Sequence, residues 1–177
     1  KSYAQILGSN DRLNFAIIGL HSRGYAHLSS LKANKSAIRI THVCDVDSNT
    51  LKKFSGNVQQ EMGYAPATNK DVREILEQKD VDAITIATPD HWHTPIAIAG
   101  LQAGKHVYVE KPCSHNPAEG ALLVQAQRKY KKLVQMGTQQ RSAPLTIEIV
   151  EKIHNGLIGR PYYAKAWYSN VRKSIGI

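Results

Sequence analysis

The chain has 177 residues, of which 42% are hydrophobic and 21% are charged. This length fits one domain, or one domain and a piece of another, and is enough to bury a sizeable apolar core. The longest uncharged apolar-rich stretch, residues 94–104, is too short to span a bilayer, and the lack of low-complexity tracts excludes collagen-like, coiled-coil and disordered chains.

Lysine and arginine outnumber aspartate and glutamate by 23 to 14, so the formal net charge is +9. Such an excess is compatible with anionic partners, namely nucleic acid, a membrane surface or phosphate-bearing ligands. The densest cluster, residues 128–132, falls late in a predicted helix, where the helix dipole favours cations. Because no nucleic-acid motif accompanies it, we expect a solvated helix end and neither nucleic acid nor membrane as a partner.

The first predicted strand, Leu13–Gly19, is apolar on both faces, as a central parallel strand should be. The segment GLHSRG follows it and opens a helix, which is the position of a dinucleotide phosphate-binding turn. Its first glycine permits the tight turn, its last permits close helix–strand packing, and the helix N–H groups meet the pyrophosphate. His21 replaces the usual middle glycine, so a plain strand-to-helix turn is the alternative. The candidate cofactor contacts here are Gly19, His21, Ser22, Arg23 and Gly24.

The second predicted strand, Ile38–Asp45, ends on an acid near the position expected for one that binds the ribose hydroxyls of a dinucleotide. The alternative is that Asp45 or Asp47 merely caps the next predicted helix, Thr50–Glu61. Asp47 and Ser48 are better placed to cap that helix. We therefore predict that Asp45 is free to bind the ribose.

A weak strand at Tyr64–Ala67 and a helix at Asp71–Gln78 precede the next predicted strand, Ala83–Thr88. The segment TPDHWH, residues 88–93, ends that strand at the carboxyl edge, where open α/β sheets bind ligands. Its two histidines would suit a metal ion, but no third Cys, His or acid is spaced to complete a site, so we expect no metal. A simple turn capped by Asp90 or Thr94 is the alternative.

Thr94 before Pro95 predicts the start of a helix, which Gly104 ends. The next predicted strand, His106–Glu110, leads into Lys111 and a proline at the same sheet edge. A lysine beside an acid at the mouth of an apolar sheet can act in proton transfer, although a loop lysine is more often only solvated.

The remaining predicted elements are a helix that Asn116 caps and that runs to about Lys132, a strand at Leu133–Met136 and a helix at Leu145–His154. The alternation of strands and helices predicts an α/β fold, a doubly wound parallel Rossmann sheet with helices on both faces. After Gly159 the pattern changes to an aromatic, strand-like segment, Tyr162–Tyr168. We predict an N-terminal extension (1–11), a dinucleotide-binding domain (12–159) and the first strand of a truncated second α/β domain (160–177).

The segments GLHSRG, CDVD, ATPDHWHTPIAIAGLQAGKHVYVEKP and QMGTQQR together resemble the Gfo/Idh/MocA (glucose–fructose oxidoreductase/inositol dehydrogenase) family. The family pattern T-P-N-x-x-H, then A-G-K-H-V-x-x-E-K-P, is kept except that Asp90 replaces the asparagine. The family's G-x-G-x-x-G-x-x-H is kept at Gly19, Gly24 and His27. The resemblance covers about residues 12–168.

The resemblance implies a Rossmann domain that binds NAD, with NADP as the alternative, followed by a C-terminal α/β domain for substrate binding and oligomerisation. It implies an oxidoreductase that transfers a hydride between the nicotinamide and a hydroxyl carbon of a sugar or polyol, with Lys111 as the catalytic lysine. The other candidate cofactor contacts are Thr88, Pro89, His91, His93, Glu110, Lys111 itself and, after the last strand, Gln139, with Arg141 facing the same crevice.

Two other functions stay open. One is an NAD-dependent glycosidase without net redox change, although such relatives have an altered lysine motif and this chain keeps it. The other is a non-catalytic nucleotide-binding module. We expect a homo-oligomer formed through the C-terminal domain and a cytoplasmic location. The alternative location is the periplasm, because the opening residues resemble family members that follow a twin-arginine export signal.

Overall fold

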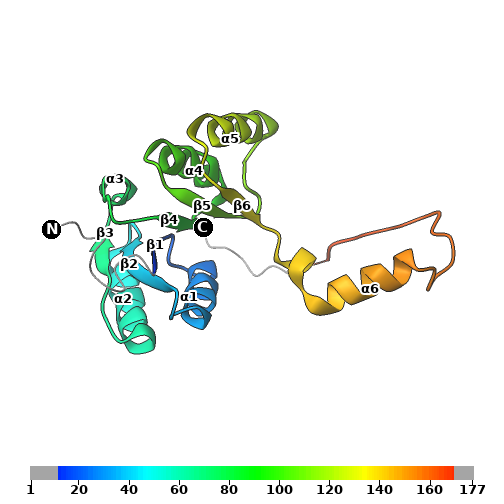
Figure 1. Cartoon of the computed structure of the whole chain (residues 1–177), viewed down its shortest axis with the longest axis horizontal. Helices are drawn as coiled ribbons and strands as arrows, with labels where there is room; N and C mark the ends of the chain where they lie inside the picture. Colours follow the sequence, from blue (N-terminus) through cyan, green and yellow to red (C-terminus); the bar gives the residue numbers. More distant parts are fainter. Residues whose placement is uncertain (1–11, 170–177) are drawn as a thin grey trace. The chain divides into compact units, whose positions relative to one another are not determined.

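The computed structural model describes residues 12–169 of the chain, and it divides the chain into two compact units, residues 1–138 and 139–177. The first unit contains one sheet of six parallel strands in the order β3-β2-β1-β4-β5-β6 (Figure 1). The strands are β1 (Leu13–Ile18), β2 (Ile38–Cys44), β3 (Ala67–Asn69), β4 (Ala83–Ile86), β5 (His106–Glu110) and β6 (Val134–Gly137).

The strand order reverses between β1 and β4, which pair in parallel in the middle of the sheet. From β1 the chain builds outward to β3, then crosses back to β4 and builds outward to β6. The loops that leave the carboxyl ends of β1 and β4 therefore diverge, and this switch point is where open α/β sheets bind ligands. The predicted doubly wound parallel sheet is confirmed, with the weak strand displaced from Tyr64–Ala67 to Ala67–Asn69.

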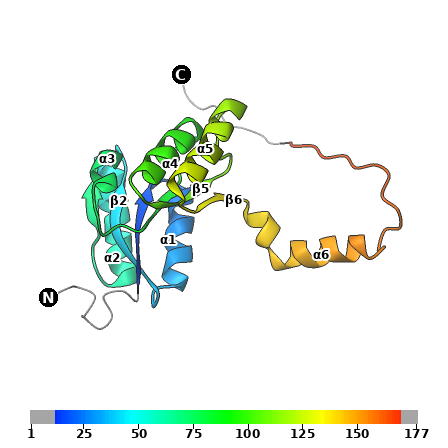
Figure 2. The same cartoon turned by 45° about the horizontal axis from the view of Figure 1, so that its top comes forward.

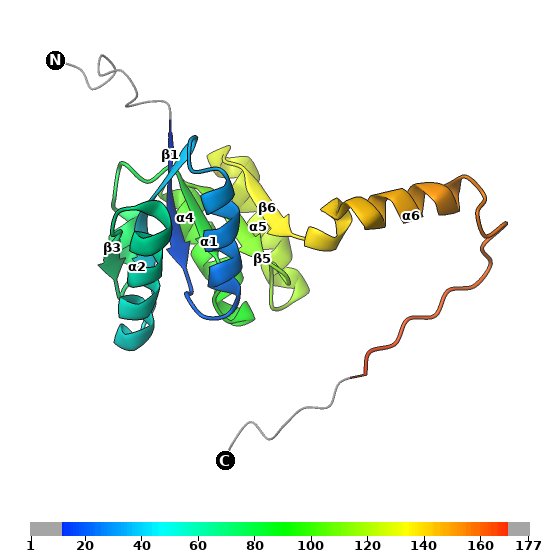
Figure 3. The same cartoon turned by 90° about the horizontal axis from the view of Figure 1, so that it is seen from below.

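Helices cover both faces of the sheet (Figures 1 and 3). One face carries α1 (Arg23–Ala33) and α2 (Ser48–Met62), and the other carries α3 (Val72–Leu76), α4 (His93–Gln102) and α5 (Pro117–Tyr130). Figure 2 shows α4 and α5 packed side by side over β5. Two separate apolar cores result, one beneath each layer of helices.

Alternate residues of β1 enter opposite cores, as the period of two in a strand requires. Ile17 packs with Phe54 of α2 on one side, whereas Ala16 and Ile18 pack with Leu101 of α4 on the other. These side chains are almost fully buried, and burying one large apolar side chain contributes about 1.5–3 kcal/mol. The strands therefore have little freedom to shift, and the loops at their carboxyl ends have fixed starting points.

The helix caps agree with the sequence prediction at two positions and differ at a third. Asp47 caps α2 by accepting from the N–H of Asn49 at 2.9 Å, and Asn116 caps α5 by accepting from the N–H of Glu119 at 3.0 Å. Thr94 was expected to cap the helix before Pro95, but α4 already begins at His93 and Thr94 lies inside it. That expectation is wrong because the Thr94 hydroxyl finds a partner elsewhere, the carbonyl oxygen of Cys113 at 2.8 Å.

The second unit contains a 3-10 helix, η3 (Gln139–Ser142), and α6 (Pro144–His154). The segment Tyr162–Tyr168, predicted as a strand, has no regular secondary structure and is exposed. A strand forms only where a neighbouring strand satisfies its backbone groups, and none of the described strands pairs with this segment. The first compact unit ends at Thr138. The predicted domain boundaries, with a second α/β domain after residue 159, stay a prediction.

No helix in the stretch from residue 12 to residue 169 has both the length and the apolar character needed to cross a membrane. The predicted N-terminal extension, residues 1–11, and the last eight residues, 170–177, lie outside the described residues.

Candidate cofactor site

The turn after β1 can be built only with glycine at two positions. Gly19 has a φ of +82°, and a Cβ atom placed on it would lie 2.6 Å from the backbone of Ala87 and Thr88 at the end of β4. A Cβ on Gly24 would lie 2.5 Å from the carbonyl oxygen of Gly19. Both positions therefore exclude a side chain, so the start of α1 lies tightly against the turn, as a phosphate-binding turn requires.

The rim of this turn is polar and open. His21, Ser22 and Arg23 are exposed, and the first turn of α1 contains no acidic residue. The N–H groups at the start of a helix carry partial positive charge and attract a phosphate group. His21, which replaces the usual middle glycine, is exposed and leaves the glycine contacts intact. The donor set and the cradle thus fit the pyrophosphate of a dinucleotide.

Asp45 follows β2 and bonds to the same turn. Its Oδ2 accepts from the backbone N–H of Leu20 at 2.9 Å, and its Oδ1 accepts from the N–H of Asp47 at 3.1 Å. The prediction that Asp47 caps α2 is confirmed. The ribose contact of Asp45 stays a prediction, and each of its two oxygens accepts one backbone hydrogen bond. A carboxylate has about four acceptor positions, so the half-buried Asp45 keeps capacity for a ribose hydroxyl.

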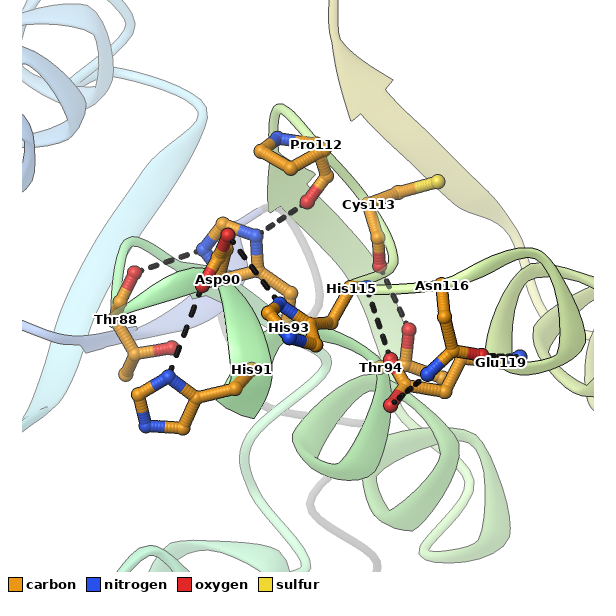
Figure 4. Close-up of polar contacts among 10 residues, drawn as sticks. All are labelled: Thr88, Asp90, His91, His93, Thr94, Pro112, Cys113, His115, Asn116 and Glu119. Atoms are coloured by element: carbon orange, nitrogen blue, oxygen red, sulfur yellow. Dashed lines mark hydrogen bonds and ion pairs between the residues drawn. The ribbon is translucent and has the colours of Figure 1, made fainter.

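The loop after β4 contains a 3-10 helix, η2 (Asp90–Trp92), and leads into the buried His93 (Figure 4). Nδ1 of His93 lies 2.6 Å from the carbonyl oxygen of Pro112, and Nε2 lies 2.8 Å from the carbonyl oxygen of Thr88. His93 therefore joins the loop after β4 to the loop after β5.

Asp90 makes a second connection between these loops (Figure 4). Its carboxylate lies 3.7 Å from Nδ1 of His91 and 3.5 Å from Nδ1 of His115. Desolvation acts to raise the pKa of Asp90, but the contacts with His115 and His91 outweigh it and hold that pKa below its ordinary value. The two histidines considered for a metal site face different partners, His91 towards Asp90 and His93 towards the two carbonyls. No group of three His, Cys, Asp or Glu side chains suited to a metal ion occurs within residues 12–169.

Glu110 ends β5 in a buried position and receives two cationic or polar partners from α1. Its Oε1 accepts from Nε of Arg23 at 2.7 Å and lies 3.0 Å from Nε2 of His27. The hydrogen bond to Glu110 raises the pKa of Arg23. Burial lowers the pKa of His27, and the contact with Glu110 only partly opposes this. The side chain of Glu110 thus connects the phosphate-binding turn to the end of β5, where Lys111 follows.

His27 is a site residue that the chemical analysis of the sequence did not select. Its only signal there was its place in the family pattern after the glycine turn. The structure buries it, sets its ring edge-on to Tyr108 at 5.4 Å between centroids, and leaves Nδ1 without a hydrogen-bond partner in the described part of the chain.

The remaining candidates are divided between the two units. Lys111 is exposed directly after β5, and its peptide bond to Pro112 is cis. Thr88 and Pro89 begin the loop after β4 at the same edge. Gln139 lies in η3 of the second unit. One edge of the first unit therefore carries the glycine turn, Asp45, the loop after β4 and the lysine segment.

Comparison with known proteins agrees with this arrangement. The family model GFO_IDH_MocA, described as "Oxidoreductase family, NAD-binding Rossmann fold", matches residues 13–138. An inositol 2-dehydrogenase of Rubrobacter xylanophilus is 26% identical over 171 residues, which are 96% of this chain and 48% of that protein. A glycosyl hydrolase family 109 protein of Shewanella baltica is 24% identical over 162 residues, 89% of this chain and 35% of that protein.

Among solved structures, the myo-inositol 2-dehydrogenase of Lactobacillus plantarum superposes with a TM-score of 0.74 at 25% identity, covering 84% of this chain and 43% of that one. The chain thus spans about half or less of the length of the relatives it matches. The glycine turn, the strand order and the match over residues 13–138 lead to one conclusion. The chain belongs to the Gfo/Idh/MocA oxidoreductase family and contains its NAD-binding Rossmann domain.

Proposed function

We propose that this chain is the cofactor-binding part of an NAD-dependent dehydrogenase that oxidises or reduces a hydroxyl carbon of a sugar or polyol. The observation that carries the proposal is the convergence of three groups at one edge of the sheet. These are the glycine turn that excludes side chains, the carboxylate of Asp45 bonded to that turn, and the lysine segment after β5. The similarity to inositol dehydrogenases supports a polyol or sugar as the substrate.

Each group has a separate task in this proposal. The turn from Gly19 to Gly24, with His21, Ser22 and Arg23 at its rim, holds the pyrophosphate, and Asp45 accepts hydrogen bonds from the adenosine ribose. Thr88, Pro89 and His91, in the loop after β4, would hold the nicotinamide end. A bound nicotinamide would supply the hydride transfer. Lys111 holds or donates the proton of the reacting hydroxyl group, which is general acid–base catalysis.

A redox-neutral glycosidase is the second candidate, and the observation that favours it is the similarity to family 109 glycosyl hydrolases. We rank it second because this chain keeps the Glu110-Lys111-Pro112 motif. We further propose that residues beyond this chain supply most substrate contacts and the surface for a homo-oligomer, because the chain covers about half of its dehydrogenase relatives.

The test is a panel of sugars and polyols offered with NAD to the whole enzyme, with NADH absorbance and free sugar both recorded. Formation of NADH that depends on one class of substrate supports the dehydrogenase. Release of free sugar without net NADH supports the glycosidase. If NAD binds and no substrate of the panel reacts, the chain belongs to a non-catalytic nucleotide-binding module and the proposal is overturned.

A further inference from the structure

The side chain of His93 lies between the loop after β4 and the loop after β5. It begins α4, and its exposed fraction is only 3%. Its ring lies between the carbonyl oxygens of Thr88, at the end of β4, and Pro112, two residues after the end of β5 (Figure 4). Both ring nitrogens are therefore occupied by backbone groups of the protein, and neither is free to contact a bound cofactor.

Carbonyl oxygens only accept hydrogen bonds, so each contact needs a proton on the ring nitrogen that faces it. The imidazolium form donates to both carbonyls at once, whereas either neutral tautomer donates to one. The two ring nitrogens lie on opposite sides of a rigid ring, so the side chain fixes the separation between the two carbonyls as well as their orientation. No shorter polar side chain has donors placed in this way.

Two further contacts act between the same loops. The hydroxyl of Thr94 donates to the carbonyl oxygen of Cys113 at 2.8 Å, and Asp90 lies 3.5 Å from His115. The start of α4 and the loop before it therefore bind the segment from Pro112 to His115 at three successive points (Figure 4). The first of these points, the carbonyl of Pro112, is one residue away from Lys111.

We propose that His93 is a positioning residue that sets the backbone of the Lys111 segment by holding the carbonyl of Pro112 to the carbonyl of Thr88. The inference rests on the proposed function, because it assigns Lys111 the proton transfer. It gives His93 a role through Lys111 in place of the direct cofactor contact expected from the sequence. A displacement of about 1 Å at a catalytic group can cost about 100-fold in rate, so the effect should fall on catalysis rather than on binding.

The first test compares His93→Gln, which keeps one N–H donor group, with His93→Leu, which keeps none. Both are measured in the whole enzyme, together with a control, His106→Gln. His106 also bonds a backbone group, the N–H of Leu133 at 3.0 Å, but at the opposite end of β5. We expect kcat to fall by about 10-fold for His93→Gln and about 100-fold for His93→Leu, with the Kd for NAD and the KM for substrate changed by less than about 3-fold. His106→Gln should leave kcat unchanged.

The second test is a double-mutant cycle with Lys111→Met. If His93 acts through Lys111, then His93→Gln should cost almost nothing further once the lysine amine is absent. Additive losses would show that His93 acts independently, and a weakened Kd for NAD at unchanged kcat would show a direct cofactor contact. Either result overturns the proposal. A wild-type enzyme that neither binds NAD nor reacts would instead overturn the proposed function.

A third measurement needs no activity. Cys113 lies half-buried in the held segment, whereas burial raises the pKa of Cys44 to about 12, so alkylation by iodoacetamide at pH 8, followed by mass spectrometry of the peptide that contains Cys113, reports on this segment. We expect His93→Gln to speed the alkylation of Cys113 several-fold and His106→Gln to leave it unchanged. Equal alkylation rates in wild type and His93→Gln would show that His93 does not hold this segment.

If His93→Leu fails to fold, Thr94→Val replaces it, because it removes the neighbouring bond to Cys113 and keeps the side-chain volume.

Discussion

The guanidinium Nε of Arg23 donates a hydrogen bond of 2.7 Å to Oε1 of Glu110, which joins the first turn of α1 to the end of β5. The same oxygen lies 3.0 Å from Nε2 of His27, one helical turn further along α1. The buried carboxylate of Glu110 therefore links the phosphate-binding turn to the end of β5, next to Lys111.

The first prediction concerns this carboxylate. Glu110→Gln keeps the shape of the side chain but removes the charge that Arg23 and His27 face. A hydrogen bond to a charged group contributes about 1.5–3 kcal/mol, so we expect the free energy of unfolding to fall by about that amount. Urea denaturation of wild type and variant measures this difference.

The control for Glu110→Gln is Glu148→Gln, which removes an exposed ion pair with Lys152 in α6. Exposed pairs on a helix contribute about 0.3–0.5 kcal/mol, so its effect should be much smaller. Equal losses in the two variants would contradict the role given to Glu110.

The second prediction concerns Lys111. Lys111→Met keeps the length of the side chain but removes the amine, and general acid–base catalysis typically contributes about 10²–10⁴ in rate. We expect kcat of the whole enzyme to fall by that factor while the Kd for NAD stays nearly constant. Lys129→Met, at an exposed position of α5, serves as the control. An unchanged kcat in Lys111→Met would make this lysine a structural residue.

The third prediction concerns the choice of dinucleotide. Asp45 is expected to bind the adenosine ribose of NAD and to repel the extra phosphate of NADP. A preference for NAD of at least ~10-fold needs only ~1.4 kcal/mol. Asp45→Ser should narrow this preference by weakening NAD binding and relieving the repulsion of NADP. Titration of both cofactors into the wild type and the variant measures it.

Because Asp45 also holds the backbone N–H of Leu20, its replacement needs a second variant that separates charge from structure. Asp45→Asn removes the charge but keeps an oxygen that can accept from Leu20. We expect Asp45→Asn to narrow the preference while the melting temperature stays close to wild type. A wild type that binds both cofactors equally, or prefers NADP, would show that Asp45 does not face the ribose. Lys52 and Lys53, exposed on α2, are the cations that would offset the repulsion in that case.

The fourth prediction concerns pH. Burial lowers the pKa of His27 in the folded protein below its ordinary value of 6.5. Above pH 6.5 the His27 ring is neutral in the folded and in the unfolded protein. As the pH falls below 6.5, the unfolded chain binds a proton before the folded protein does. The contribution of His27 to stability is therefore complete above about pH 6.5 and is lost as the pH falls below it. Urea midpoints between pH 7.5 and pH 5 should fall less steeply in His27→Gln than in wild type, and parallel curves would contradict the prediction.

The apolar runs of the sequence were sufficient to predict the sheet. β1, β4 and β5 are short, nearly continuous runs of apolar residues, and only a strand covered on both faces accommodates such a run. Gly19 and Gly24 were also recognisable, because a tight turn from a strand into a helix demands glycine at those points. The carboxyl ends of parallel strands lie at one edge of the sheet. The sequence therefore also placed Asp45, the loop that begins at Thr88, and Lys111 at the same edge.

The partners of the polar side chains were decided only by the tertiary structure. The sequence identified Asp45 as an acid at the right strand end, but only the folded sheet brings the N–H of Leu20, in the glycine turn, to its Oδ2. Thr94 had the local pattern of a helix cap, yet the loop after β5 offers its hydroxyl the carbonyl of Cys113. His27 and Glu110 meet although 83 positions separate them. Local patterns report the backbone preference of a few neighbouring residues, whereas a buried hydrogen bond forms with whichever group the packing of the sheet edges brings within about 3 Å.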